Sequence, residues 1–274
     1  MTMHQTTRTA GAPARLVRWH ELLPGRAWLL RSLSLLVTLA VWEWYGRGVD
    51  PIFLSYPTAI LAAIPGMITS GELPSAFMAS LGGLAVGLGI SIVVGVALGL
   101  LTGRYRTLDY LTDVQISALY STPTVGLLPL LVLWFGLGGV AKIMLIFLAA
   151  FFPIIVNTHS GVRNISRNLV EVAQAEGANE FQIFMKIIVP ASLPFIMTGI
   201  RLAIGRAVVG MVVGEYFTSV DGLGGAIVTY GNSFATAKLF VVLIVLAVLG
   251  IALTEAVRLV ERRAAPWKES ERAT

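Results

Sequence analysis

The feature of this sequence that most limits its fold is a series of long apolar runs. Six stretches are almost entirely hydrophobic and about as long as a membrane-spanning helix, which needs roughly 20 residues. They cover residues 29–45, 76–101, 114–137, 140–158, 191–217 and 239–260. The runs predict an all-α membrane protein with about six transmembrane helices.

The composition excludes several other classes of protein. Of the 274 residues, 56% are hydrophobic and only 13% are charged, whereas soluble domains carry about 25% charged residues. An ordinary soluble enzyme and a disordered chain are therefore both excluded. The chain has no cysteine, which excludes disulfides and thiolate ligands. Its histidines, His4, His20 and His159, are too scattered to form a metal site.

The distribution of basic residues predicts the orientation. With both ends inside the cell, the outside loops hold only Arg47, Lys142 and Lys238, and the other loop arginines and lysines lie on the cytoplasmic side. This arrangement obeys the positive-inside rule, so we expect an even number of spans and two cytoplasmic termini. We therefore interpret the basic residues as signals that set the orientation of the chain in the membrane, and we expect no nucleic-acid partner. The expected domains are a basic tail over 1–28, a transmembrane region over 29–260 and a second tail over 261–274.

Three local patterns predict how the helices are built. Small residues four apart, as in Gly83–Gly87 and Gly95–Gly99, indicate close packing of the helix at 76–101. Pro123 and Pro129 predict a kink or break in the third span. At that break, Tyr120, Thr122 and their polar neighbours either line a polar path or only satisfy freed carbonyl groups. The segment 59–68 is too short to span a bilayer, and we favour an interfacial helix over a re-entrant loop.

The loop over 163–190 is the longest cytoplasmic segment and has its own pattern. A short helix is expected up to Glu176, with Gly177 ending it in the left-handed conformation. Asn179 and Gln182 then have the spacing of a capping box for a second helix. We expect Pro190 to close that second helix before the fifth span begins. The loop shows no nucleophile–base pair, and it looks like a docking element more than a hydrolytic site.

The same loop resembles the EAA loop of ABC-importer permeases. The family pattern E-A-A-x3-G-x9-I-x-L-P is matched by Glu171-Val-Ala173, Gly177 and Ile187-Ile-Val189-Pro190, with valine replacing alanine and leucine once each. The segments Ser121-Thr-Pro-Thr-Val-Gly-Leu-Leu-Pro129 and Leu133-Trp-Phe-Gly-Leu-Gly138 are similar to permeases for nitrate, taurine and aliphatic sulfonates.

The resemblance implies a multi-pass protein of the bacterial inner membrane with the type I importer fold. It also implies partners: a second permease copy, two cytoplasmic ATP-binding subunits and an extracytoplasmic binding protein. The ATPase-docking positions carried over from the family are Glu171, Ala173 and Gly177, with Gln174 and Ala178 beside them. The chain has no G-x4-G-K-[ST] phosphate loop, so ATP is expected on a partner. The chain itself is not expected to be an enzyme or to carry a cofactor or metal.

Charged residues inside the fifth span have more than one interpretation. Arg206 lies deep in the span and either attracts an anionic substrate or pairs with carbonyl groups. We expect Glu215 to form a gate or an inter-subunit contact. The resemblance implies sulfonate, taurine or nitrate as the substrate, with pyrimidine vitamin precursors as the alternative. A self-sufficient secondary transporter would show inverted halves and midplane carboxylates, and a membrane enzyme would show paired acids or a histidine cluster; we find neither pattern.

Overall fold

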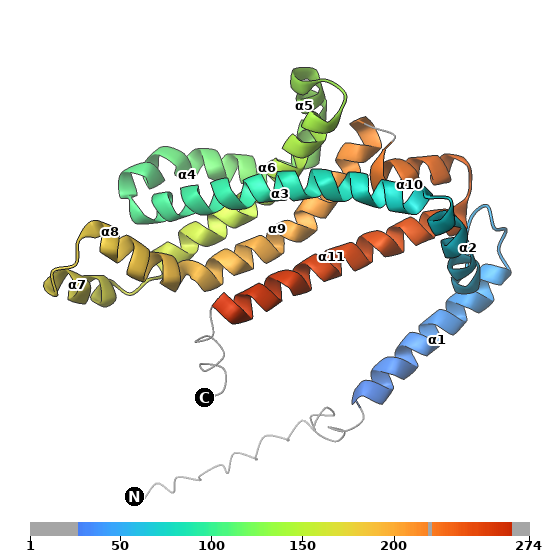
Figure 1. The fold of residues 1–274 in the computed structure, drawn as a ribbon, viewed down its shortest axis with the longest axis horizontal. Helices are drawn as coiled ribbons and strands as arrows, with labels where there is room; N and C mark the ends of the chain where they lie inside the picture. The colour runs from blue at the N-terminus through green and yellow to red at the C-terminus, as the bar shows by residue number, and fades with distance from the viewer. Residues whose placement is uncertain (1–26, 219–220, 265–274) are drawn as a thin grey trace, which may run out of the picture.

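The computed structural model describes residues 27–218 and 221–264, and every element in these ranges is helical (Figure 1). The elements are α1 (Ala27–Arg47), α2 (Pro57–Thr69), α3 (Glu72–Arg104), α4 (Arg106–Ser121), η2 (Thr124–Leu127), α5 (Leu128–Phe135), α6 (Gly139–Arg163), α7 (Arg167–Ala175), α8 (Glu180–Ile183), η3 (Phe184–Ile188), α9 (Val189–Thr218), α10 (Gly222–Asn232) and α11 (Thr236–Ala264). The expected tails, 1–28 and 261–274, fall mostly outside the described residues. Their inner ends, up to Ala264 on the C-terminal side, belong to α1 and α11.

Four of the described helices are long and apolar enough to cross a membrane without a break. They are Glu72–Arg104, Gly139–Arg163, Glu180–Thr218 and Thr236–Arg263. A further pair of helices, α4 and the segment Thr124–Phe135, is apolar enough when taken together but meets at an angle of 94°, so it forms a fifth span only as a broken one. The sequence predicted six spans. The difference is α1, a helix of 21 residues whose mean hydropathy is lowered by Arg31 and Glu43.

The break in the third span confirms the prediction from its prolines. Pro123 takes an extended conformation with ψ of 105°, between the end of α4 and the start of η2. Pro129 lies in the first turn of α5, where its missing N–H has no intrahelical partner to lose. One proline therefore turns the chain and the other begins the next helix.

The core of the molecule is the packing of α6 between α3 and α9, which run alongside it (Figure 1). Glycines of α3 face β-branched residues of α6 so closely that an added Cβ would lie within 2.9 Å of their side chains. The pairs are Gly87 with Ile146, Gly95 with Ile154 and Gly99 with Thr158. The small-residue spacing therefore packs two helices together, as the sequence predicted.

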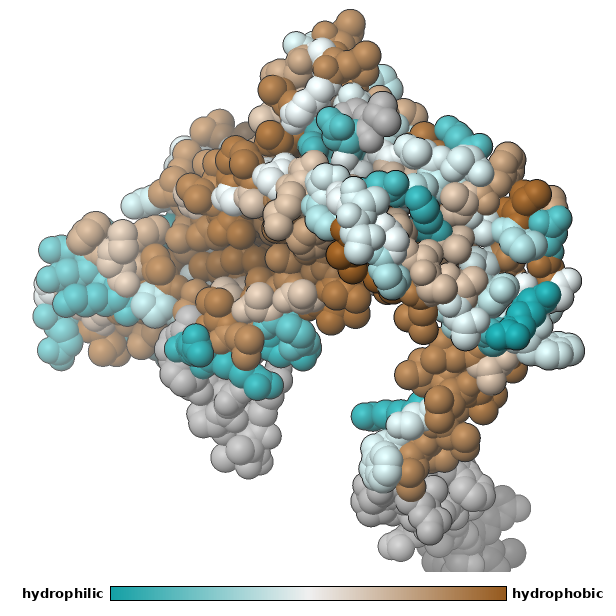
Figure 2. Space-filling model, turned by 45° about the vertical axis from the view of Figure 1, so that its right-hand side comes forward, coloured by the Kyte–Doolittle hydropathy of each residue, from teal (hydrophilic) through white to brown (hydrophobic). Residues whose placement is uncertain are grey.

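The surface is apolar where a soluble protein would be polar. Figure 2 shows hydrophobic side chains over α1 and between the two ends of the molecule, with hydrophilic side chains at the end that holds α7 and α8 and also at the opposite end, near α2 and α10. On α1, Leu33, Leu36 and Val41 are each more than half exposed. Such an apolar patch marks a membrane or protein interface, and its extent here fits a bilayer as the surrounding medium.

Candidate functional site

The first part of the EAA-like loop (residues 163–190) is a helix that ends in a well-defined motif. Helix α7 runs from Arg167 to Ala175, and Gly177 has φ of +81°. The Gly177 N–H donates to the Gln174 carbonyl at 3.0 Å, and the Ala178 N–H donates to the Ala173 carbonyl at 2.9 Å. These two bonds form a Schellman motif, which satisfies the last carbonyls of the helix. The predicted helix end at Gly177 is confirmed.

The second part of the loop begins at the predicted capping box. The Asn179 side chain accepts from the Gln182 N–H at 2.8 Å, and the Gln182 side chain accepts from the Asn179 N–H at 2.9 Å. The two bonds satisfy donors that the start of a helix otherwise leaves free. With the Schellman motif just before it, both sides of the Gly177 turn are held by hydrogen bonds.

The prediction that Pro190 closes this helix is wrong. The chain from Glu180 to Thr218 forms one continuous helical span. The segment Phe184–Ile188, directly before Pro190, is a π-helix. In a regular α-helix the proline ring would clash with the carbonyl four residues earlier. The wider turn admits an extra residue at this point, so the helix passes through the proline and does not stop.

The five predicted docking residues lie on two sides of α7. Ala173 and Ala178 are half-buried against the core of the bundle, while Glu171, Gln174 and Gly177 are exposed. The small alanines bring the helix close to the bundle, and the polar residues are left available to another protein. The arrangement is a short, firmly held helix at the end of the molecule.

Two of the predicted path residues, Tyr120 and Thr122, lie at the break after α4 and make different contacts. The Thr122 hydroxyl donates to the Ala118 carbonyl at 2.9 Å, so it satisfies a carbonyl at the helix end. Tyr120 instead meets Arg206 of α9. The Arg206 guanidinium lies 4.8 Å from the centre of the Tyr120 ring and donates to its hydroxyl at 3.2 Å.

Arg206 also lines a cavity of about 270 Å³ between η2, α6 and α9. The other walls are mainly apolar and include Val125, Leu145 and Val209. Within the described part of the chain, no carboxylate forms an ion pair with Arg206. A guanidinium that is held by a tyrosine and opens into an apolar cavity has the chemistry to attract an anion.

The Glu215 side chain is buried in the interior of the protein, and it does not line the cavity at Arg206. Its side chain has no exposed area and pairs with Lys142 of α6 at 3.2 Å. It also accepts from the Ser80 hydroxyl at 2.8 Å and from the Gly224 N–H at 2.9 Å. The carboxylate therefore joins α3, α6, α9 and α10. The sequence placed Lys142 in an outside loop, and its position at the start of an apolar run was the signal that it is buried.

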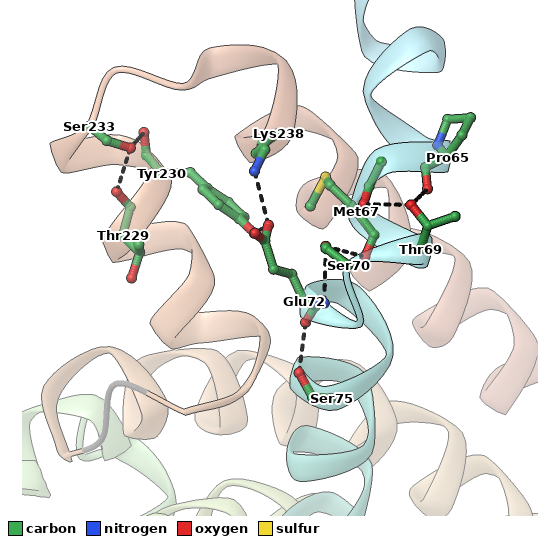
Figure 3. A network of polar contacts seen from close by, with 11 residues as sticks. Pro65, Met67, Thr69, Ser70, Glu72, Ser75, Thr229, Tyr230, Ser233 and Lys238 are labelled. Atoms are coloured by element: carbon green, nitrogen blue, oxygen red, sulfur yellow. Dashed lines mark hydrogen bonds and ion pairs between the residues drawn. The ribbon is translucent and has the colours of Figure 1, made fainter.

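A second polar network joins three helices beyond the Glu215 cluster (Figure 3). Glu72, the first residue of α3, accepts from the Tyr230 hydroxyl and from the Lys238 ammonium, each at 2.9 Å. Burial and the hydrogen bond to Glu72 together raise the pKa of Tyr230 to about 12. Tyr230 therefore stays protonated and continues to donate to Glu72 at any physiological pH.

Ion pairs also fasten the opposite end of the bundle. Arg201 of α9 pairs with Glu261 of α11, and Arg163 of α6 pairs with Asp109 of α4. His159 Nε2 lies 2.9 Å from the same Asp109 carboxylate. Arg201 is thus a partner in an ion pair between helices, and His159 of α6 contacts a carboxylate of α4.

Comparison with known proteins agrees with this arrangement. The family model described as "Binding-protein-dependent transport system inner membrane component" matches residues 91–266. The aliphatic sulfonates transport permease protein SsuC of Bacillus subtilis is 35% identical over 90% of this chain and 91% of its own length. The taurine transport system permease protein TauC of Escherichia coli is 29% identical over 93% and 94%. The formylaminopyrimidine transport permease protein ThiX of Halalkalibacterium halodurans is 31% identical over 88% and 96%.

The fold also has a counterpart among solved structures. A chain of the MetNI methionine ABC transporter, in an inward-facing conformation, matches with a TM-score of 0.60 and 21% identity, covering 68% of this chain and 92% of that chain. The expected type I importer fold is confirmed. The chain therefore belongs to the family of inner membrane components of binding-protein-dependent transport systems.

Proposed function

We propose that this chain is the permease subunit of an ATP-driven importer. In this proposal the 21-residue helix α1 also crosses the membrane, so that both termini lie in the cytoplasm. Two copies form the path, two cytoplasmic ATP-binding subunits drive it, and an extracytoplasmic binding protein delivers the substrate. ATP is bound and hydrolysed on the partner subunits, and the permease needs no cofactor of its own. The observation that carries the proposal is the α7–Gly177–α8 unit, a firmly held helix with exposed Glu171 and Gln174 at the end of a membrane bundle. Family membership supports this function over a self-sufficient secondary transporter.

The geometry of the loop supports its action as a rigid lever. The Schellman motif at Gly177 and the capping box at Asn179 fix the angle between α7 and α8. Because α8 continues into the 39-residue span Glu180–Thr218, a displacement of α7 is transmitted directly to that span. The ATP-binding subunits drive the change through different affinities for the two conformations of the permease.

The proposed substrate is a small sulfonate-like anion. The chain resembles permeases named for aliphatic sulfonates and for taurine. The cavity at Arg206 adds a physical reason, because a single guanidinium among apolar walls suits an anion with a short aliphatic body. A pyrimidine precursor is the second candidate, on the strength of the similarity to ThiX. The cavity favours the sulfonate, since the described walls offer one strong anion partner.

The proposal is tested at Gly177. A Cβ at this position meets no atom within 4 Å, so any effect of a substitution comes from the backbone conformation. Gly177→Val places a β-branched residue at φ of +81°, which it adopts only with strain. We expect substrate-stimulated ATP hydrolysis of the assembled transporter to be lost while the basal rate remains. Gly177→Asn is the matched control, because asparagine tolerates this conformation. Normal uptake by the valine variant would count against a lever role for α7.

A further inference from the structure

A cavity lined by arginines lies behind α7, where α3, α4 and α6 come to the same end of the bundle. Its volume is about 330 Å³, within the range of small-molecule sites. The polar and charged residues on its wall are Arg104, Arg106, Arg163, Arg167, Glu171 and Gln174. We refer to it as the basic cavity. Nothing in the permease function proposed above uses these four guanidinium groups.

The positive charge of the basic cavity is only partly neutralised. Arg104 pairs with Glu180, and Arg163 pairs with Asp109. Among residues 27–218 and 221–264, Arg106 and Arg167 form no ion pair, although both are exposed. The Nε atom of Arg104 is buried and likewise has no hydrogen-bond partner in these ranges. Against these donors the cavity wall itself offers one carboxylate, that of Glu171.

The backbone adds to the same field. Arg106 is the first residue of α4, and Arg167 is the first residue of α7. Neither preceding residue, Tyr105 or Ser166, caps its helix through a side chain. The free N–H groups and positive dipole ends of both helices therefore lie beside the two unpaired guanidinium groups. Helix N-termini and arginines each favour a bound anion.

We propose that the basic cavity binds a phosphate group, carried by an anionic lipid of the inner leaflet or by a free phosphate. Guanidinium groups form paired, charge-assisted hydrogen bonds with phosphate oxygens. The cavity lies at the bundle end that the basic loops assign to the cytoplasm, where lipid headgroups meet the protein. Its wall also includes Val162 and Ile188, which suit the apolar part of a phosphate ester. The inference concerns binding alone and does not depend on transport.

The test compares three forms of the full-length chain: the wild type, Arg106→Gln/Arg167→Gln and Lys186→Gln/Arg263→Gln. The last is the matched control, since it removes two exposed basic side chains from outside the basic cavity. One arm extracts each protein from phosphatidylcholine vesicles containing phosphatidylglycerol and measures the retained anionic lipid by native mass spectrometry. A parallel set of vesicles contains diacylglycerol, which has the tails without the phosphate. The second arm titrates each protein in detergent with inorganic phosphate.

We expect the cavity variant to bind at least one phosphate probe about tenfold more weakly than the wild type, with the control unchanged. Loss confined to phosphatidylglycerol identifies a lipid headgroup, and loss for inorganic phosphate identifies a free ligand. Arg106→Lys/Arg167→Lys should restore part of the binding, because the charge is kept.

Equal binding of both probes by the wild type and the cavity variant would overturn the proposal. An equal loss in the control would overturn it too, since general surface charge would then explain the binding. If the cavity variant loses only its affinity for the ATP-binding subunit, the cavity receives an acidic protein segment and the proposal is wrong.

Discussion

At the scale of single residues, the buried ion pair of Lys142 and Glu215 is the feature with the largest desolvation cost. Both side chains are almost or fully buried, and each would be costly to bury alone. The pair is tolerable because Ser80 and the Gly224 N–H complete the hydrogen bonding of the carboxylate. Four helices therefore depend on one charge remaining neutralised.

Removing the lysine should destabilise the protein strongly. In Lys142→Met the Glu215 carboxylate stays buried without its cation, and we expect a loss of about 3–5 kcal/mol. The double variant Lys142→Met/Glu215→Gln should recover part of this loss, because no unpaired charge remains. Thermal unfolding in detergent measures both effects. Arg258→Met, which breaks the exposed pair with Glu255, should cost no more than about 1 kcal/mol. A similar cost for Lys142→Met and Arg258→Met would contradict the role given to the buried pair.

The substrate role proposed for Arg206 gives a second prediction at this scale. Arg206→Gln keeps a polar side chain but removes the cation from the apolar cavity, and we expect sulfonate uptake to fall by about tenfold or more. Arg206→Lys should retain part of the uptake. The measurement is uptake of a radiolabelled alkanesulfonate by vesicles that contain the assembled transporter. Uptake by the glutamine variant at the wild-type rate would remove Arg206 from the substrate path.

Sequence reasoning found these residues singly but not their partners. Arg206 and Glu215 stood out because charges are rare in apolar runs. Their partners Tyr120 and Lys142 lie 86 and 73 residues away, so only the folded arrangement brings them together. Glu215 was expected at a gate or between subunits, and the structure places it inside one chain. Nothing local in the sequence indicates that α10 folds back over it.

At the scale of elements, local patterns predicted the EAA-like loop well. The end of α7 and the capping box of α8 each depend on residues within five positions of one another, so local chemistry determines them. The error at Pro190 has the opposite cause. A proline usually interrupts a helix, but here the π-helical turn before it accommodates the ring. The geometry of the turn before the proline, and not the proline alone, therefore decides whether the helix continues.

The contact between α3 and α6 gives a prediction at this scale. Gly99→Ala would place a Cβ 2.6 Å from the Thr158 Cβ and 2.9 Å from the Ile155 carbonyl oxygen. We expect a loss of about 1–3 kcal/mol, because the two helices must separate. Gly89→Ala is the matched control on the same helix, where a new Cβ meets nothing within 4 Å, and it should be neutral or slightly stabilising. Equal melting temperatures for the two variants would show that the glycine contacts do not hold the helices together.

At the scale of the whole molecule, composition and run length predicted the class of protein but not the number of spans. Among the residues that the structure describes, four helices are long and apolar enough to cross a membrane, or five if the bent pair of α4 and Thr124–Phe135 is one span, where six were expected. The difference lies in α1, whose charges leave it between a membrane helix and an interfacial one. How such a helix is seated depends on its packing and on the surrounding lipid, which no single sequence window records.

The predicted orientation of the whole chain can be tested cleanly because the chain has no cysteine of its own. Single cysteines at Asp50 and Ser233 should react with an impermeant maleimide on intact cells. Those at Asn164 and Glu176 should react only after the membrane is opened. All four positions are exposed, so a difference in labelling reports the side of the membrane and not burial. Labelling of Glu176→Cys on intact cells would show that the orientation is the reverse of the predicted one.

The π-helical turn at Phe184–Ile188 has a consequence for how this family of chains tolerates change in length. Each residue of a helix advances the direction of its side chains by about 100°. The one additional residue held in that turn therefore sets the direction, around the axis of the span, in which the preceding residues of the loop point. Deleting it would turn Glu171 by roughly a quarter-turn around the axis, and it would also bring the Pro190 ring against the carbonyl four residues earlier. The spacing between Gly177 and Pro190 is therefore an angular setting, and a shortened loop would present its docking face to the wrong neighbour.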